Sequence, residues 1–348
     1  MKALGFLSLL ALTYFPILSP AQGNYWFPQN PAPLVEDLRD ISVIDPNTAI
    51  VACEEGLILK TTNGGFSWDT LFYHDDPIFS FNKLFFTDEQ NGWVIGEMVI
   101  KTTNGGVNWY SCPVCLDVVN DIFFIDPQIG YLAGKEGNKA TILKTSDGGQ
   151  SWTPILSDST LWTTMCVQFI SVNVGYAGGY QKVLKTMDGG ETWFDIGAPL
   201  LGYIVNNIHF ADENTGYIVN ERGKIARTLD GGASWSVCSY TGLDVRSVYC
   251  LGESNAWICG NDTLGFYGVV KHTLDGGYSW TSVIEENSNC VYSIDFLDET
   301  AWFVGSHGSA YLSHDEGGNW SKISGSFTKA SLLSICFIDQ DVGWLSGY

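Results

Sequence analysis

Short apolar runs separated by turn residues recur along almost the whole chain. Residues 84–86 (Leu-Phe-Phe) lead to Asp88, and residues 122–125 (Ile-Phe-Phe-Ile) lead to Asp126. A pair of Gly or Ala with an aromatic residue then follows, as in Gly130-Tyr131, and is closed by a glycine three residues later. Runs of β-branched and aromatic residues bounded by Gly, Asn and Asp are typical of consecutive antiparallel strands. We therefore expect an all-β chain that needs no helix.

One eight-residue pattern organises these strands. It begins with a hydroxyl residue, has Asp or Asn at its third position and Gly at its fifth, and ends with Trp. Its seven copies are residues 61–68, 102–109, 145–152, 186–193, 228–235, 273–280 and 313–320. Successive tryptophans lie 40 to 45 residues apart, a spacing typical of one four-stranded propeller blade.

The chemistry of this motif explains its composition. The Asp or Asn side chain and the hydroxyl can bond turn amides, Gly supplies a positive φ, and Trp buries its ring beside the turn. Seven copies around a ring cannot all form one active site. We assign a structural role to the third residue of each motif: Asn63, Asn104, Asp147, Asp188, Asp230, Asp275 and Asp315.

The number of blades follows from the first two strands of each repeat. Eight such pairs are present, and the eighth ends at Tyr348 before its third strand. Residues 25–28 (Tyr-Trp-Phe-Pro) resemble an isolated fourth strand, which would close the ring and remove an open sheet edge by completing the last blade. We expect a β-propeller of four-stranded antiparallel blades, eight in number with the last incomplete; the alternative is seven.

The N-terminus has the pattern of a secretory signal peptide. Lys2 precedes an apolar run, residues 3–18, which leads to the small residues Ser19 and Ala21. We expect cleavage after Ala21, so that residues 1–21 are the signal peptide and residues 22–348 the propeller. An uncleaved membrane anchor is the alternative. The cleaved protein would be periplasmic, extracellular or at the cell surface, without a membrane span.

Charge and cysteine content narrow the function. The net charge is −21 with only four arginines, which excludes a nucleic-acid partner. The acidity is spread along the chain and favours a soluble monomer. Cys112 and Cys115 form the single C-x-x-C pair among nine cysteines, too few for a zinc site, so we expect no metal and no cofactor. The sequence allows a disulfide between Cys250 and Cys259 on neighbouring strands but does not decide whether it forms.

At the motifs and the Gly-aromatic strands, the chain resembles the Asp-box (BNR) propellers, and most closely the plant photosystem II stability and assembly factor-like group. The resemblance covers nearly all of residues 22–348. It implies an exported propeller that holds a protein partner during assembly and catalyses nothing. Because Asp-boxes also occur in sialidases, sortilin-type receptors and xyloglucan hydrolases, they specify the fold more strongly than the activity.

Two surfaces are candidates for binding. The first candidate consists of the residues that lie six positions before the turn that ends each first strand. We expect these residues to form a ring at the mouth of the central channel, where polar groups converge as in a ligand site. Its members are Arg39, Asn82, Asn120, Met165, Asn206, Arg246, Tyr292 and Leu333. An alternative is that these polar groups only satisfy the backbone amides at strand ends that meet the channel water. The loop rim has exposed aromatics on a rigid frame: Tyr73, Tyr110, Trp162, Tyr203, Tyr240, Phe266 and Tyr267.

A glycosidase of sialidase type is the competing function. It would need three arginines for the substrate carboxylate, besides a nucleophile and an acid. After Arg227 is assigned to the strand before a box, only Arg39, Arg222 and Arg246 remain for this triad, and no Arg-Ile-Pro type segment precedes the first box. No catalytic residue is therefore predicted.

Overall fold

The computed structural model describes most of the chain after residue 37. The described residues are 38–45, 47–53, 56–63, 69–74, 80–197, 203–262, 267–287, 291–297, 300–305, 310–313, 315, 317–322, 332–337 and 343–347. All regular elements in these ranges are β-strands. The expected signal peptide and the proposed closing strand at residues 25–28 lie outside the described residues.

The strands form eight consecutive sheets, which we number as blades 1 to 8. Blades 1 and 2 are β1 (Leu38–Asp45), β2 (Thr48–Cys53), β3 (Ile58–Thr61), β4 (Asp69–Phe72), β5 (Phe81–Phe86), β6 (Gly92–Gly96), β7 (Val99–Thr102) and β8 (Tyr110–Cys112). Blades 3 and 4 are β9 (Val118–Phe124), β10 (Gly130–Glu136), β11 (Lys139–Thr145), β12 (Thr153–Asp158), β13 (Thr164–Phe169), β14 (Gly175–Gly179), β15 (Val183–Thr186) and β16 (Phe194–Asp195).

Blades 5 and 6 are β17 (Val205–Phe210), β18 (Gly216–Asn220), β19 (Lys224–Thr228), β20 (Ser236–Tyr240), β21 (Leu243–Cys250), β22 (Ala256–Asp262), β23 (Tyr267–Thr273) and β24 (Thr281–Asn287). Blade 7 is β25 (Val291–Leu297), β26 (Thr300–Gly305), β27 (Ala310–Ser313) and β28 (Ser321–Lys322), and the described part of blade 8 is β29 (Leu332–Phe337) and β30 (Gly343–Gly347).

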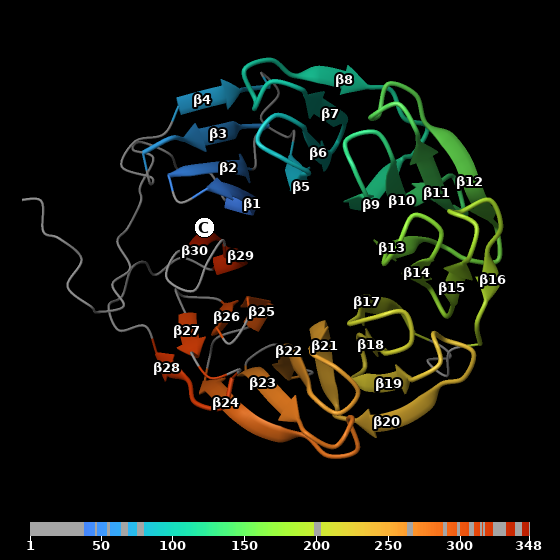
Figure 1. Ribbon diagram of the computed structural model, residues 1–348, viewed down its shortest axis with the longest axis vertical. Coiled ribbons are helices and arrows are strands. Elements are labelled where there is room, and N and C mark those ends of the chain that lie inside the picture. Colours follow the sequence, from blue (N-terminus) through green and yellow to red (C-terminus); the bar gives the residue numbers. More distant parts are fainter. Residues whose placement is uncertain are drawn as a thin grey trace, which may run out of the picture.

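The blades form a closed ring. Each sheet is antiparallel in simple chain order, and its first strand lies nearest to the centre of the ring (Figure 1). β29 and β30 pack against β1, so blade 8 meets blade 1 and closes the circle. The all-β propeller of four-stranded blades is therefore confirmed, and the described residues supply eight blades, which makes the alternative of seven wrong.

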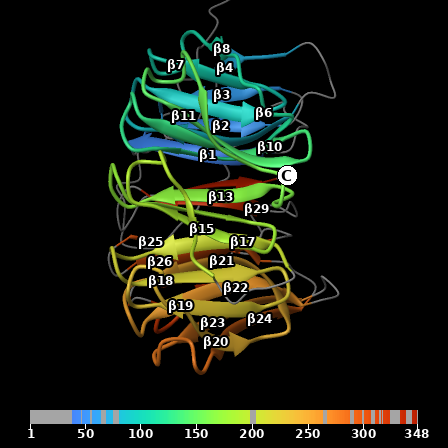
Figure 2. The same ribbon diagram turned by 90° about the vertical axis from the view of Figure 1, so that its right-hand side faces the viewer.

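The ring has two different faces, because the strands run across its thickness (Figure 2). Every described Asp-box begins at the last residue of a third strand, as Thr145 ends β11, and leads into the fourth strand. The box in blade 3 also bonds the turn between the first two strands, from the Gly148 amide to the Gln128 carbonyl at 2.9 Å. We call this side the box face, and the side with the other turns and the inter-blade connections the loop face.

Aromatic stacking fills the space between neighbouring blades. Trp93 of β6 stacks on Phe124 of β9 with ring centroids 3.5 Å apart, and Phe124 meets Trp152 edge-on at 6.0 Å. Gly130 lies directly over the Phe124 ring, where an added Cβ would come within 2.3 Å of it. The Gly of each Gly-aromatic pair therefore leaves room for the ring of the preceding strand, while the aromatic residue packs against the next blade.

Polar contacts join the blades at the box face. Lys144 Nζ and the Tyr131 hydroxyl of blade 3 both donate to the Gly189 carbonyl, the fourth box residue of blade 4, at 2.6 and 3.0 Å. Lys185 and Tyr176 of blade 4 reach the Gly231 carbonyl in the same way, at 2.5 and 3.0 Å. Each of these box turns thus accepts side-chain hydrogen bonds from the second and third strands of the preceding blade.

The described cysteines do not form the bridge that the sequence left open. Cys250 lies opposite Ala256, whereas Cys259 lies opposite Ser247, and both are buried free thiols. Cys112 and Cys115 are free thiols as well. Among the described residues, there is no apolar helix long enough to span a bilayer.

Candidate functional site

The Asp-box turns are held by a dense set of local hydrogen bonds. In blade 3, Asp147 accepts the Thr145 hydroxyl at 2.8 Å, the Ser151 amide at 2.9 Å and the Ser151 hydroxyl at 2.6 Å. The Thr145 oxygen in turn accepts the Gly149 amide at 2.7 Å, and Gly148 and Gly149 have φ of 70° and 85°. These bonds, the Ser151 hydroxyl first, lower the pKa of Asp147 to about 2.

The same turn is built in boxes that carry Asn instead of Asp. Asn104 accepts the Thr102 hydroxyl at 3.0 Å and the Asn108 amide at 2.9 Å. In blade 1, the Thr61 hydroxyl donates to Asn63 at 3.0 Å. Asp188, Asp230, Asp275 and Asp315 repeat the arrangement of Asp147. In blades 2 to 7, the geometry of the third-position residue is that of a turn stabiliser; in blade 1, residues 64–68 of the box lie outside the described part of the chain.

The predicted channel-mouth residues share one structural position. In every first strand, the residue at this position is skipped by the pairing with the second strand, as Asn120 is skipped between Val119 and Asp121. The skipped residues are Arg39, Asn82, Asn120, Met165, Asn206, Arg246, Tyr292 and Leu333. The ring therefore consists of eight equivalent β-bulges near the loop-face ends of the innermost strands. The side chains of Tyr292 and Leu333 lie outside the described residues.

Two of the bulge asparagines join neighbouring blades. Asn120 Nδ2 donates to the Thr164 carbonyl at 2.7 Å and to the Thr163 hydroxyl at 2.9 Å. Asn206 Nδ2 donates to the Val245 carbonyl at 2.8 Å. In both cases the acceptor carbonyl belongs to the residue just before the next bulge. These side chains bond the backbone of the next blade, whereas Asn82 is exposed.

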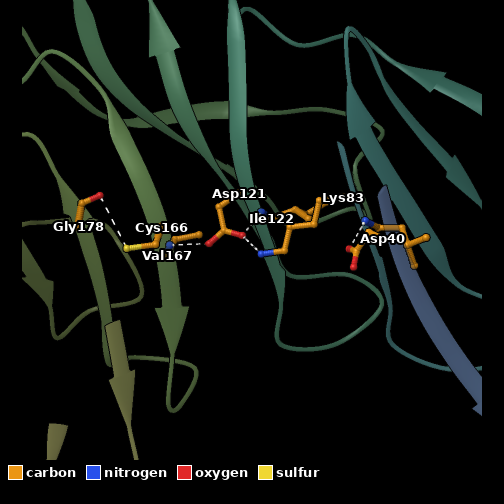
Figure 3. Close-up of polar contacts among 8 residues, drawn as sticks. Asp40, Lys83, Asp121, Ile122, Cys166, Val167 and Gly178 are labelled. Carbon is orange, nitrogen blue, oxygen red and sulfur yellow. Dashed lines mark hydrogen bonds and ion pairs between the residues drawn. The ribbon is translucent and has the colours of Figure 1, made fainter. Parts of the chain in front are cut away.

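In blades 1 to 3, the residue after the bulge continues this inter-blade bonding (Figure 3). Asp40 accepts the Leu84 amide of blade 2 at 2.9 Å, and Asp121 accepts the Val167 amide of blade 4 at 2.9 Å. Lys83 forms an ion pair with Asp121. Burial alone would lower the pKa of the Lys83 ammonium, but the Asp121 carboxylate outweighs it and holds that pKa above its ordinary value.

The remaining ring contacts are also internal. Asn207 accepts the Val248 amide at 3.3 Å. Arg246 pairs with Asp244 at 2.7 Å, although 52% of its side chain stays exposed. The partners of Asn120, Asn206 and Asn207 lie on the next blade, about one repeat away, and the sequence did not indicate them. The partner of Arg246 is instead on its own strand, two residues before it.

The loop rim is a continuous surface over blades 3 to 5. The Tyr180 amide donates to the Thr163 carbonyl at 3.3 Å, and the Gln181 amide donates to the Tyr203 carbonyl at 3.0 Å. The Glu221 amide then bonds the Ile204 carbonyl at 3.3 Å. These bonds link the connection before β13, the β14–β15 turn, the connection before β17 and the β18–β19 turn.

Exposed aromatic rings stand on this surface, each beside a cation. Trp162 is 55% exposed, with Lys135 Nζ 5.2 Å from its ring centre. Tyr203 is 38% exposed, and the Arg222 guanidinium lies 5.5 Å from its ring centre. Between them, Gln181 has a φ of 65°, the single positive φ of a non-glycine residue in the described part of the chain. Such strain is common at functional surfaces.

The other predicted rim residues differ in their placement. Tyr73 follows β4 and is 55% exposed, and Tyr240 ends β20 and is 67% exposed, as expected for the loop face. Tyr110 is instead the first residue of β8, directly after a box, so its assignment to the rim was wrong. Phe266 and the side chain of Tyr267 lie outside the described residues.

A buried His–Cys pair went unnoticed in the sequence. His209 Nδ1 lies 3.1 Å from Cys250 Sγ. Burial lowers the pKa of His209 to about 4 and raises that of Cys250 to about 12. Both groups are therefore neutral near pH 7, and the thiolate that a nucleophile needs is absent. In the described residues, no group of three His, Cys, Asp or Glu could hold a metal ion.

The comparisons with known proteins agree with this architecture. A family model described as "Photosynthesis system II assembly factor YCF48" matches residues 111–199 and 199–289, just over half of the chain. A comparison with curated protein sequences finds no match.

Three solved structures illustrate the likeness in fold. YCF48 from Cyanidioschyzon merolae is 18% identical with a TM-score of 0.61, covering 82% of this chain and 97% of that one. A structure described as YCF48 bound to D1 peptide is 18% identical with a TM-score of 0.53, covering 90% and 91%. A GH74 xyloglucanase from Xanthomonas campestris is 12% identical with a TM-score of 0.51, covering 82% of this chain and 45% of the enzyme. On the family match, the chain belongs to the photosystem II assembly factor YCF48 family.

Proposed function

We propose that this chain is an exported, non-catalytic scaffold that holds a protein partner on its loop face during assembly. Family membership supports the assembly role. A relative of the same fold is described as bound to a peptide, D1, so a propeller of this kind can present a peptide-binding surface.

The observation that carries the proposal is the rim over blades 3 to 5. Trp162 and Tyr203 are exposed, yet Lys135 and Arg222 hold their rings and backbone bonds fix their loops. Rigid aromatic side chains that lose little entropy on binding are the usual anchors of protein interfaces. By contrast, Asn120, Asn206 and Asp121 of the ring are engaged in bonds between blades, which leaves the rim as the better binding surface.

The placement of the arginines argues against a sialidase-type enzyme. Arg39 and Arg246 lie at bulges of β1 and β21, whereas Arg222 lies in the β18–β19 turn against Tyr203. Arg246 is already paired with Asp244. A carboxylate-binding triad needs all three guanidinium groups aimed at one point.

Export rests on the pattern of residues 1–21 and is part of the proposal. Mass spectrometry of the protein recovered outside the cytoplasm tests it: an N-terminus at Gln22 is expected, and an intact leader on a cytoplasmic protein would contradict it.

Photo-crosslinking tests the binding surface. A benzophenone amino acid at Trp162 or Tyr203 is expected to give an adduct with one protein of the exported fraction, competed by excess unlabelled protein. The matched control places the probe at Thr103, an exposed box residue of blade 2. No competed adduct from the rim, or hydrolysis of a fluorogenic sialoside, would contradict the proposal.

A further inference from the structure

The box face carries apolar side chains that the box turn does not require. The second box residue is Met187 in blade 4, Leu229 in blade 5 and Leu274 in blade 6, and these are 64%, 45% and 71% exposed. Tyr278, in the same box as Leu274, is 63% exposed. We call these four residues the apolar arc.

Other boxes of this chain show that a polar residue suffices at this position. Blades 1, 2 and 3 have Thr62, Thr103 and Ser146 there. The box of blade 3 closes with the same bonds as that of blade 4: the hydroxyl-to-Asp distance is 2.8 Å in both. The hydroxyl also accepts the second box glycine's amide in both, at 2.7 and 2.8 Å. Folding therefore does not explain the apolar side chains.

The arc is a row and not a scatter of single residues. Lys185, two residues before Met187, bonds the Gly231 carbonyl in the box that contains Leu229. Arg227, two residues before Leu229, bonds the Glu253 carbonyl of blade 6 at 2.8 Å. The boxes of blades 4, 5 and 6 are thus direct neighbours. Single exposed apolar residues are ordinary, but rows of them mark interaction surfaces.

Negative charge surrounds the arc. Hydrogen bonds, chiefly from the side chain four residues on, lower the pKa of Asp188, Asp230 and Asp275 to about 2, so these carboxylates stay ionised. Exposed Glu191, Glu213 and Glu253 lie on the same boxes and turns. The two nearby cations, Lys185 and Arg227, are bonded to backbone carbonyls.

We propose that the apolar arc is a docking surface for a basic amphipathic segment of a partner protein. Its apolar face would cover Met187, Leu229 and Leu274, and its Lys or Arg residues would meet the surrounding carboxylates. A second copy of this chain is the wrong partner, because two acidic faces of a protein with net charge −21 repel each other. This surface lies on the face opposite the rim, so it is a second binding site.

Designed peptides test the proposal in the full mature protein. Three helical peptides are compared, each about 18 residues long. The Lys/Leu peptide has Lys on its polar face and Leu on the opposite face. The Lys/Ser peptide has Ser in place of Leu, and the Glu/Leu peptide has Glu in place of Lys. Fluorescence anisotropy at physiological salt is expected to show binding of the Lys/Leu peptide about tenfold or more tighter than of the Lys/Ser peptide, and none of the Glu/Leu peptide.

The variant Met187→Ser/Leu229→Thr/Leu274→Thr copies residue types found in other boxes. We expect it to bind the Lys/Leu peptide about tenfold more weakly than the wild type does. Val107→Thr, at a 71% exposed box position of blade 2, is the matched control and should bind as wild type. Equal affinity for the two Lys peptides, or no effect of the triple variant, would overturn the proposal. A wild-type protein that forms a dimer, together with a triple variant that is monomeric, would also overturn the proposal.

Hydrogen exchange gives a readout that does not depend on how the variants fold. With wild-type protein and the Lys/Leu peptide, amides of residues 186–193, 228–235 and 273–280 are expected to gain protection. Protection confined to the loop face, or to boxes outside blades 4 to 6, would overturn the assignment.

Discussion

Lys144 of blade 3 donates a hydrogen bond from Nζ to the Gly189 carbonyl in the Asp-box of blade 4, at 2.6 Å. The box that closes one blade is therefore also the acceptor for the blade before it. This double use explains why Lys immediately precedes four of the boxes, in blades 1 to 4, and why the period of the motif is kept so closely.

Lys144→Met should lower the free energy of unfolding by about 1.5–3 kcal/mol, because a charged donor to a partly buried carbonyl is lost. Urea unfolding measures the change. Lys139→Met removes an exposed lysine from the start of β11 and should change stability by less than about 0.5 kcal/mol. If the two variants were equally stable, the joint between blades would not depend on the lysine.

Asp147→Ala removes the acceptor for Thr145 and Ser151 and should destabilise the protein by about 1–3 kcal/mol. Asp147→Asn should retain most of the stability, since Asn104 builds the same turn in blade 2. Thermal and urea unfolding of both variants checks this difference. An Asn variant as unstable as the Ala variant would show that the charge, and not the turn bonds, stabilises the box.

Stability should fall in acid between about pH 4 and pH 2. The folded pKa of the box aspartates lies at about 2, below the ordinary value of 3.8. A lowered folded pKa adds stability that is complete above the unfolded pKa and is lost as the pH falls through the folded one. Unfolding free energies measured from pH 6 to pH 2 should therefore decline below pH 4, and less steeply in Asp147→Asn/Asp230→Asn. A flat profile in the wild type would refute this.

Trp152→Ala should destabilise the protein by about 3–5 kcal/mol, because its ring packs edge-on against Phe124. Trp152→Phe should lower the free energy of unfolding by less than Trp93→Phe does. The indole nitrogen of Trp152 has no hydrogen-bond partner among the described residues, whereas Trp93 Nε1 donates to the Gly148 carbonyl at 3.1 Å. Calorimetric unfolding of the two Phe variants measures the difference, and the reverse order would contradict the assigned contacts.

The fold was predictable because its signals are local and repeated. The box needs its hydroxyl, Asp or Asn, and glycines within one turn, and Gly130 needs only the Phe124 ring beside it. The same offset before each first-strand turn also selected eight residues that the structure shows to be β-bulges, although the sequence did not predict the bulges themselves. These features depend on contacts within a single repeat, which one stretch of sequence contains.

The site was harder to predict because its contacts cross between blades. The partner of Asn120 is the Thr164 carbonyl, and that of Asp121 is the Val167 amide. Nothing near either residue in the sequence indicates these acceptors and donors, since the register between blades is set by packing. Tyr110 was misplaced for a simpler reason: β8 begins immediately after its box.

Binding of a protein partner at the loop rim can be measured in one capture experiment. Immobilised wild-type protein and three variants are exposed to the exported fraction: Trp162→Ala/Tyr203→Ala, Arg39→Gln/Arg246→Gln and the surface control Tyr110→Ala, which is 53% exposed in the wild type. Thermal unfolding checks each fold. We expect the Trp162→Ala/Tyr203→Ala variant to keep its melting temperature and to capture the partner about tenfold or more weakly. Tyr110→Ala should capture it as the wild type does, and the arginine variant should lose little capture because Arg246 is already paired with Asp244. Unchanged capture by the Trp162→Ala/Tyr203→Ala variant would contradict binding at the loop rim.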